Sequence, residues 1–152
     1  MKTIQFLPKI LLLFAILIGG IACTNGNAED EESMSQINDD MTQGVWIISK
    51  FEDSGKDETS DFQGYDFTFS TTGTLTATKG TTTYVGSWSV TDFDVDEDNP
   101  GDLDFNIFFD LSNQFEDLNE DWDINSHTST KIELFDTGGD DEDSDFLTFQ
   151  RK

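Results

Sequence analysis

Apolar and polar side chains alternate with a period of two along most of the chain after residue 43. The pattern is clearest where Leu103, Phe105, Ile107 and Phe109 are separated by mostly polar residues. Successive side chains of a β-strand point to opposite faces, so this period predicts strands with one buried face. The predicted strands cover residues 44–51, 65–70, 74–79, 82–90, 103–110, a segment starting at 122, 131–135 and 145–151.

Short polar turns such as Thr71-Thr72-Gly73 and Lys79-Gly80 separate consecutive strands. Turns of this length are typical of antiparallel hairpins, because parallel strands need long crossover connections. Eight strands suffice to close a barrel, whose interior is then filled with side chains or holds one small ligand. We therefore predict an all-β fold, an eight-stranded antiparallel up-and-down barrel in which Gly86 permits either a close backbone approach or a bend of the strand.

One short helix or helical turn is predicted between the strands. Asn113 is followed by Glu116 in the spacing of a capping box, and Phe115, Leu118 and Trp122 follow at helical spacing. We expect this helix to cover one end of the barrel, with its apolar face serving as a plug for the core.

The first 23 residues indicate export from the cytoplasm. Lys2 and Lys9 precede an apolar run over residues 10–18, and mostly small residues lie between this run and Cys23. At about 1.5 Å per helical residue, this run is too short to span a bilayer core of about 30 Å. The pattern resembles the bacterial lipoprotein signal, which implies a signal peptide over residues 1–22 and lipidation of Cys23 by acyl chains such as palmitate. Ordinary cleavage nearby, with a free thiol, is the alternative.

Residues 23–43 show no evident apolar periodicity and carry the acidic run Glu29-Asp30-Glu31-Glu32. We predict a flexible acidic tether here. An acidic run shortly after the lipidated cysteine also resembles the export signal of surface lipoproteins in Bacteroidetes. A solvated linker kept extended by its charge is the alternative interpretation.

The composition limits the partners of the chain. Its formal net charge is -24 over 152 residues. Such a surface repels phosphate backbones, so we expect no nucleic-acid binding, and we expect attraction to cations and basic partners. Without residues 1–22 the chain has the length of one domain, which we expect to be monomeric and anchored to the membrane by its lipid. Because Cys23 is the sole cysteine, no disulfide within the chain is available.

The sequence Gly44-x-Trp46 at the first strand resembles the Gly-x-Trp signature of lipocalins. Residues 44–152 as a whole resemble the lipocalin-like lipoproteins of Bacteroidetes. This resemblance implies a lipocalin-like β-barrel in which Trp46 closes one end and Arg151, on the last strand, lies across the indole. It further implies a place in the cell envelope, at the outer membrane and with surface exposure as one option.

Two acidic loops raise the question of calcium. Residues 92–104 and 136–145 contain closely spaced carboxylates, and Ca²⁺ takes six to eight oxygen ligands. The EF-hand spacing fails, because counting from Asp92 places Glu97 where the glycine is required and Leu103 where the last acid is required. We interpret both loops as solvated acidic loops, with calcium binding as the alternative.

Candidate catalytic chemistry is sparse. His127 is the sole histidine, and no Gly-x-Ser-x-Gly nucleophile elbow is present. We therefore expect neither an enzyme nor a cofactor or metal centre. Three functions stay open: a membrane-anchored lipocalin-like carrier of a small apolar molecule, a filled barrel that acts as a structural or interaction module, and an acidic surface that binds calcium or basic partners.

Overall fold

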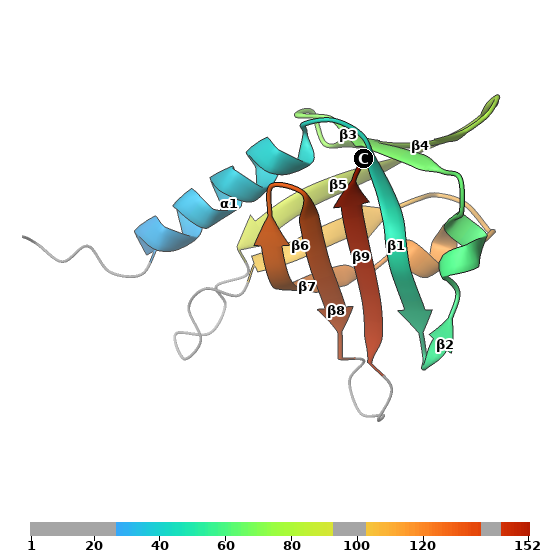
Figure 1. Cartoon of the computed structure of the whole chain (residues 1–152). Helices are drawn as coiled ribbons and strands as arrows, with labels where there is room; N and C mark the ends of the chain where they lie inside the picture. Colours follow the sequence, from blue (N-terminus) through green and yellow to red (C-terminus); the bar gives the residue numbers. More distant parts are fainter. Residues whose placement is uncertain (1–26, 93–102, 138–143) are drawn as a thin grey trace, which may run out of the picture.

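Eight antiparallel strands close into a barrel in the part of the chain that the structure describes. This computed structural model describes residues 27–92, 103–137 and 144–152, with side chains from residue 33 onward. Each barrel strand pairs with the next, and the last pairs with the first (Figure 1). The predicted all-β up-and-down barrel is confirmed. The strands are β1 (Trp46–Asp53), β3 (Asp66–Phe69), β4 (Thr74–Lys79), β5 (Thr82–Asp92), β6 (Leu103–Phe108), β7 (Asp121–Thr128), β8 (Lys131–Asp136) and β9 (Asp145–Arg151).

Three short elements accompany the barrel strands. The two-residue strand β2 (Lys56–Asp57) folds back on the end of β1, and the 3₁₀ turn η1 (Thr59–Phe62) follows it. The predicted helix after Asn113 is a single 3₁₀ turn, η2 (Glu116–Leu118), at whose start the amide of Glu116 donates to the carbonyl of Asn113. Leu118 and the preceding Phe115 are buried, so the predicted apolar plug is present.

A helix, α1 (Asn27–Met41), occupies most of the segment for which we predicted a flexible tether. That prediction is wrong for residues 27–41. Ile37 and Met41 are buried, and the carbonyl of Met41 accepts a hydrogen bond of 2.9 Å from Trp46 Nε1. A helix of this length gains most of its stability from such tertiary packing.

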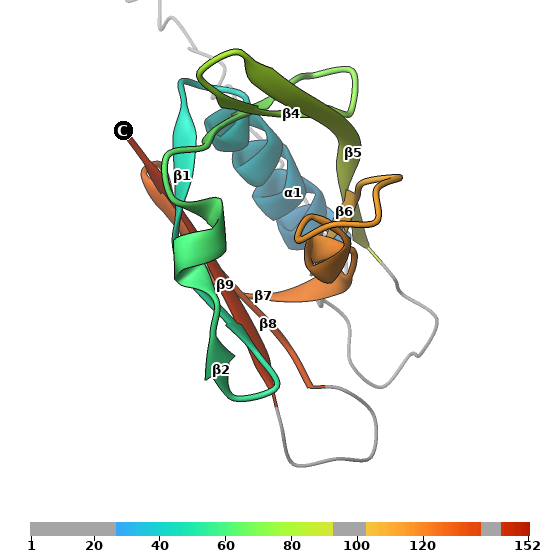
Figure 2. The same ribbon diagram turned by 90° about the vertical axis from the view of Figure 1, so that its right-hand side faces the viewer.

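The two ends of the barrel are covered by different elements. Figure 2 looks along the barrel, with α1 behind the ring of strands and the turns η1 and η2 in front. Helix α1 packs against β5 and β7. The barrel therefore has an α1 end and an opposite end formed by the two 3₁₀ turns.

The closure between β1 and β3, which we name the β1–β3 seam, is the narrowest pairing of the barrel. Its register contains the single pair Trp46 and Phe67. At its far end, β1 pairs with β2 instead of β3. Between these two pairings, the hydroxyl of Thr59 accepts a hydrogen bond of 2.8 Å from the amide of Phe51. Turn η1 therefore covers the edge of β1 where β3 has diverged.

Strand β6 ends two residues earlier than predicted. Phe109 turns into the interior, and the side chain of Asn119 takes the place of a strand partner for it. Asn119 Oδ1 accepts from the amide of Phe109 at 2.6 Å, and Asn119 Nδ2 donates to the Phe109 carbonyl at 2.9 Å. The chain can leave the sheet here because these two backbone groups stay hydrogen-bonded.

Candidate functional site

The barrel interior, where the lipocalin resemblance places a ligand, is occupied by aromatic side chains. A continuous series of ring contacts runs through it, with centroid separations of 5.2 to 6.4 Å. Every ring in the series is buried. Edge-to-face aromatic pairs add about 0.5–1.5 kcal/mol each beyond the burial of their area. In order along the series the rings are Trp88, Phe69, Phe149, Phe67, Phe115, Phe62, Phe51 and Trp122.

Trp46 and Arg151 form the contact that the lipocalin resemblance implies. The guanidinium carbon of Arg151 lies 5.9 Å from the centroid of the Trp46 ring, and Trp46 is fully buried. Gly44 has a φ of +82°, and a Cβ at that position would lie 3.2 Å from Arg151 Cδ. The glycine of Gly-x-Trp therefore leaves room for the arginine side chain that covers the indole.

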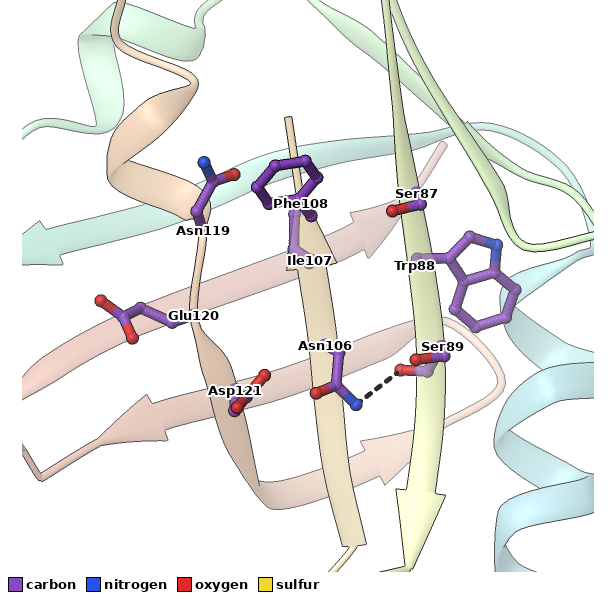
Figure 3. Close-up of a pocket in the computed structure, with 9 residues that line it drawn as sticks. All are labelled: Ser87, Trp88, Ser89, Asn106, Ile107, Phe108, Asn119, Glu120 and Asp121. Carbon is purple, nitrogen blue, oxygen red and sulfur yellow. Dashed lines mark hydrogen bonds between the residues drawn. The ribbon is translucent and has the colours of Figure 1, made fainter. Parts of the chain in front are cut away.

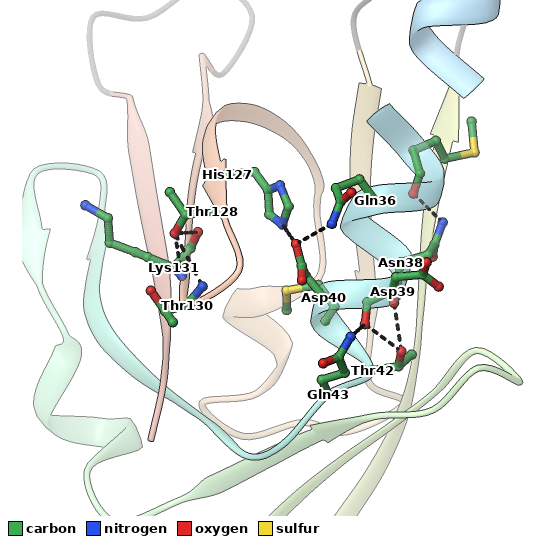
Figure 4. Close-up of polar contacts among 12 residues, drawn as sticks. Gln36, Asn38, Asp39, Asp40, Thr42, Gln43, His127, Thr128, Thr130 and Lys131 are labelled. Atoms are coloured by element: carbon green, nitrogen blue, oxygen red, sulfur yellow. Dashed lines mark hydrogen bonds and ion pairs between the residues drawn. The ribbon is translucent and has the colours of Figure 1, made fainter. Parts of the chain in front are cut away.

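His127 lies near the end of β7 and contacts α1, as Figure 4 shows. Its Nε2 is 3.3 Å from Asp40 Oδ2, which also accepts a hydrogen bond of 3.1 Å from Gln36 Nε2. The buried Nε2 has no hydrogen bond of suitable geometry among the described residues. Burial lowers the pKa of His127, and the nearby Asp40 carboxylate raises it by a smaller amount. His127 is thus a neutral contact between helix and barrel at neutral pH.

An open groove lies on the outer face of β5, β6 and the start of β7 (Figure 3). We call it the outer groove. It has a volume of about 340 Å³, and exposed side chains from all three elements line it. Trp88 and Ile107 contribute to its floor, but both are buried. The remaining lining residues are Ser87, Ser89, Asn106, Phe108, Asn119, Glu120 and Asp121.

The divergence of β6 from β7 produces the outer groove. The register pairs Asn106 with Asp121, and one further hydrogen bond of 3.2 Å joins the amide of Ile107 to the carbonyl of Glu120. Beyond that bond, neither Phe108 nor Asn119 is part of the register between β6 and β7. Phe108 therefore projects outward beside a polar wall of amide, hydroxyl and carboxylate groups.

Neighbouring carboxylates repel Glu120 in the outer groove. Partial burial raises the pKa of Glu120, and repulsion from Asp136, Asp145, Asp121 and Asp53 raises it further. No ion pair among the described residues uses Glu120 or Asp121. A positive charge in the groove would relieve this repulsion.

A second open groove follows the β1–β3 seam. It has a volume of about 510 Å³ and extends from Ile47 and Ile48 on β1 to Gln63 and Gly64. Phe62, which forms part of its floor, belongs to the aromatic series of the interior. The groove is therefore open to the outside, and the buried ring of Phe62 forms part of its inner boundary.

Several sequence predictions fall outside the described residues. Cys23 lies there, as do 93–102 and 138–143, the central parts of both acidic loops. Within the described ranges, no group of three or more potential metal-ligating side chains is close enough to hold an ion. No helix in those ranges is long and apolar enough to cross a membrane.

Comparisons with known proteins yield one similar structure. No protein-family model matches the chain, and no curated protein matches it. The fold is similar to the crystal structure of a DUF4847 family protein from Bacteroides vulgatus. The two chains are 16% identical with a TM-score of 0.48, and the likeness covers 74% of this chain and 94% of the other.

The outer groove was not among the sites predicted from the sequence. Its signal is visible in the strand pattern, where Phe108 occupies a position expected to be polar. The acidic members Glu120 and Asp121 could not be selected from the sequence, because 32 acidic residues are present. Strand register alone brings these side chains beside Phe108.

Proposed function

We propose that this protein is a membrane-anchored, non-catalytic lipocalin-like lipoprotein of the bacterial envelope whose filled barrel serves as an interaction module. The observation that carries this proposal is the aromatic series from Trp88 to Trp122. Protein interiors packed in this way have few voids larger than a water molecule. A carrier needs a pocket that encloses most of its ligand, and a packed core does not offer one.

The signal pattern that ends at Cys23 supports the envelope location in this proposal. Helix α1 begins at Asn27, so a lipid on Cys23 would hold the helix and the attached barrel close to the membrane surface. The packing of Ile37 and Met41 gives the anchored segment a fixed attachment to the barrel at residues 37–41.

The surroundings of His127 support a non-catalytic role. The ring lies between α1 and β7 beside an open surface groove, and its Nε2 faces the Asp40 carboxylate. A general base needs hydrogen-bonding reach to a substrate proton. Here the imidazole contributes instead to the contact between helix and barrel.

Displacement of a fluorescent fatty acid tests the filled barrel. We expect no saturable binding at micromolar protein, because buried rings in mutual contact occupy the barrel interior in the described part of the chain. The cavity control is Phe115→Ala, probed with benzene in place of the fatty acid; it removes a ring that contacts Phe62, Tyr65, Phe67, Tyr84 and Phe109.

The substitution should leave an apolar cavity able to take up a small apolar molecule, at a cost of about 3–5 kcal/mol in unfolding free energy. Circular dichroism verifies that the variant is folded before binding is measured. Stoichiometric fatty-acid binding by the wild-type protein would show that the barrel is a carrier after all.

A further inference from the structure

The outer faces of β5 and β6 carry an exposed apolar patch. Val85 and Phe108 are 62% and 56% exposed, respectively. Phe108 is opposite Ser87 in the register of the two strands, and Val85 lies two residues before Ser87 on the same face of β5. Apolar side chains that gather on a surface, instead of occurring singly, are typical of interaction sites.

The patch is continuous with the outer groove. Phe108 belongs to both, and Ser87 separates Val85 from the polar part of the groove. On the far side of Phe108, Glu120 and Asp121 line the groove without an ion-pair partner among the described residues. One continuous surface therefore carries the apolar patch and, beside it, two carboxylates.

A free strand edge lies next to this surface. In the described chain, β6 accompanies β5 only from Ser87 onward, whereas β5 begins at Thr82. From Thr82 to Val85, β5 pairs only with β4. An unpaired edge of this kind is a template for the backbone of an added strand.

We propose that the patch and the outer groove together bind an extended cationic peptide segment of a partner protein. One apolar side chain of the peptide lies on Val85 and Phe108, and a lysine or arginine two residues along, which shares that face of an extended segment, enters the groove toward Glu120 and Asp121. The face of an exposed phenylalanine ring also attracts such a cation. This inference rests on the proposed role as an interaction module and names its partner class.

Charge complementarity selects this occupant. The carboxylates of Glu120 and Asp121 belong to a protein of strongly negative net charge, and a cation relieves the repulsion that Asp121, Asp136 and Asp145 exert on Glu120. An acidic or neutral segment leaves that repulsion in place. The free edge of β5 favours an extended backbone over a helix, because strand addition uses its main-chain groups.

The experiment measures fluorescence anisotropy of a labelled peptide that repeats two valines followed by two lysines, so that each face of the extended peptide carries both residue types, titrated with the full-length protein at physiological salt. A peptide that repeats two valines followed by two glutamates is the negative probe. We expect saturable binding of the cationic peptide alone. Phe108→Ser and the double variant Glu120→Gln with Asp121→Asn should each weaken it by about fivefold or more.

A matched control separates a site from general attraction to an acidic protein. Asp39→Asn combined with Asp61→Asn also removes two negative charges, but from exposed positions outside the groove. This control should change the affinity less than twofold. Equal weakening by both double variants, or no binding of the cationic peptide, would overturn the proposal. The fatty-acid experiment depends on the interior alone, so its outcome and this one are distinguishable.

Discussion

Gly86 shows how one residue sets the spacing of the sheet. A Cβ at this position would lie 2.4 Å from the carbonyl oxygen of Phe108 and 2.7 Å from the ring of Phe109. Neither can move freely, because the oxygen belongs to the backbone and Phe109 is buried. The close backbone approach predicted from the sequence is confirmed, and it occurs where Phe109 turns into the core.

We expect Gly86→Ala to destabilise the protein by about 1–3 kcal/mol, the usual cost of forcing extra atoms into a packed core. Urea denaturation followed by circular dichroism measures the change. Ser87→Ala is the adjacent control; it replaces an exposed side chain, and its effect should stay within about 0.5 kcal/mol. Equal effects of the two substitutions would refute the steric explanation.

Helix α1 is the element that the sequence pattern did not reveal to us. Its inward face is short: Ile37 and Met41 are buried, and Met34 is partly buried. These positions have the i, i+3, i+7 spacing of one helix face, so the sequence does contain a pattern that indicates a helix. The acidic residues around these positions give the segment the composition of a linker. The strands were predictable because their alternation extends over many residues. The outer groove was not, because it depends on where β6 and β7 diverge.

The contact between α1 and β7 makes stability depend on pH. Burial places the pKa of His127 in the folded protein below its ordinary value of 6.5. The unfolded chain therefore binds more protons as the pH falls below about 6.5, and the folded state loses stability toward the lower folded pKa. The loss for one such group cannot exceed about 1.4 kcal/mol per pH unit.

His127→Gln should flatten this part of the profile between about pH 7 and pH 5, as measured by urea denaturation at each pH. Asp40→Asn should steepen it, because it removes the carboxylate that raises the pKa of His127. The acidic residues common to all three proteins cancel in the comparison. Parallel profiles for the three would contradict the assignment.

On the scale of the whole molecule, the closed barrel and the anchor together define the proposed role. The barrel architecture followed from the number of predicted strands and their short turns, and the structure confirms it. The filled interior was harder to predict from the sequence, because a sequence shows which side chains point inward but not how completely they pack. The ring contacts from Trp88 to Trp122 show that aromatic side chains pack against one another across the interior.

Lipidation of Cys23 predicts where the molecule is found in the cell. Wild-type protein should appear in the membrane fraction with the mass of its acyl chains, whereas Cys23→Ser should lack them and leave that fraction. Intact-protein mass spectrometry and immunoblotting of separated fractions provide the measurements. An unmodified thiol at residue 23 of the wild-type protein would remove the anchor from the proposed function.

The β1–β3 seam determines how the cylinder comes apart. Only Trp46 and Phe67 are paired there, whereas β1 and β9 share six paired positions. Rupture at the seam leaves every other neighbouring strand pair intact, so the barrel opens into a twisted sheet with β1 near one edge and β3 at the other. The backbone amides that bond between β1 and β3, at Trp46 and Phe67, should accordingly exchange with deuterium sooner than the amides that bond between β1 and β9.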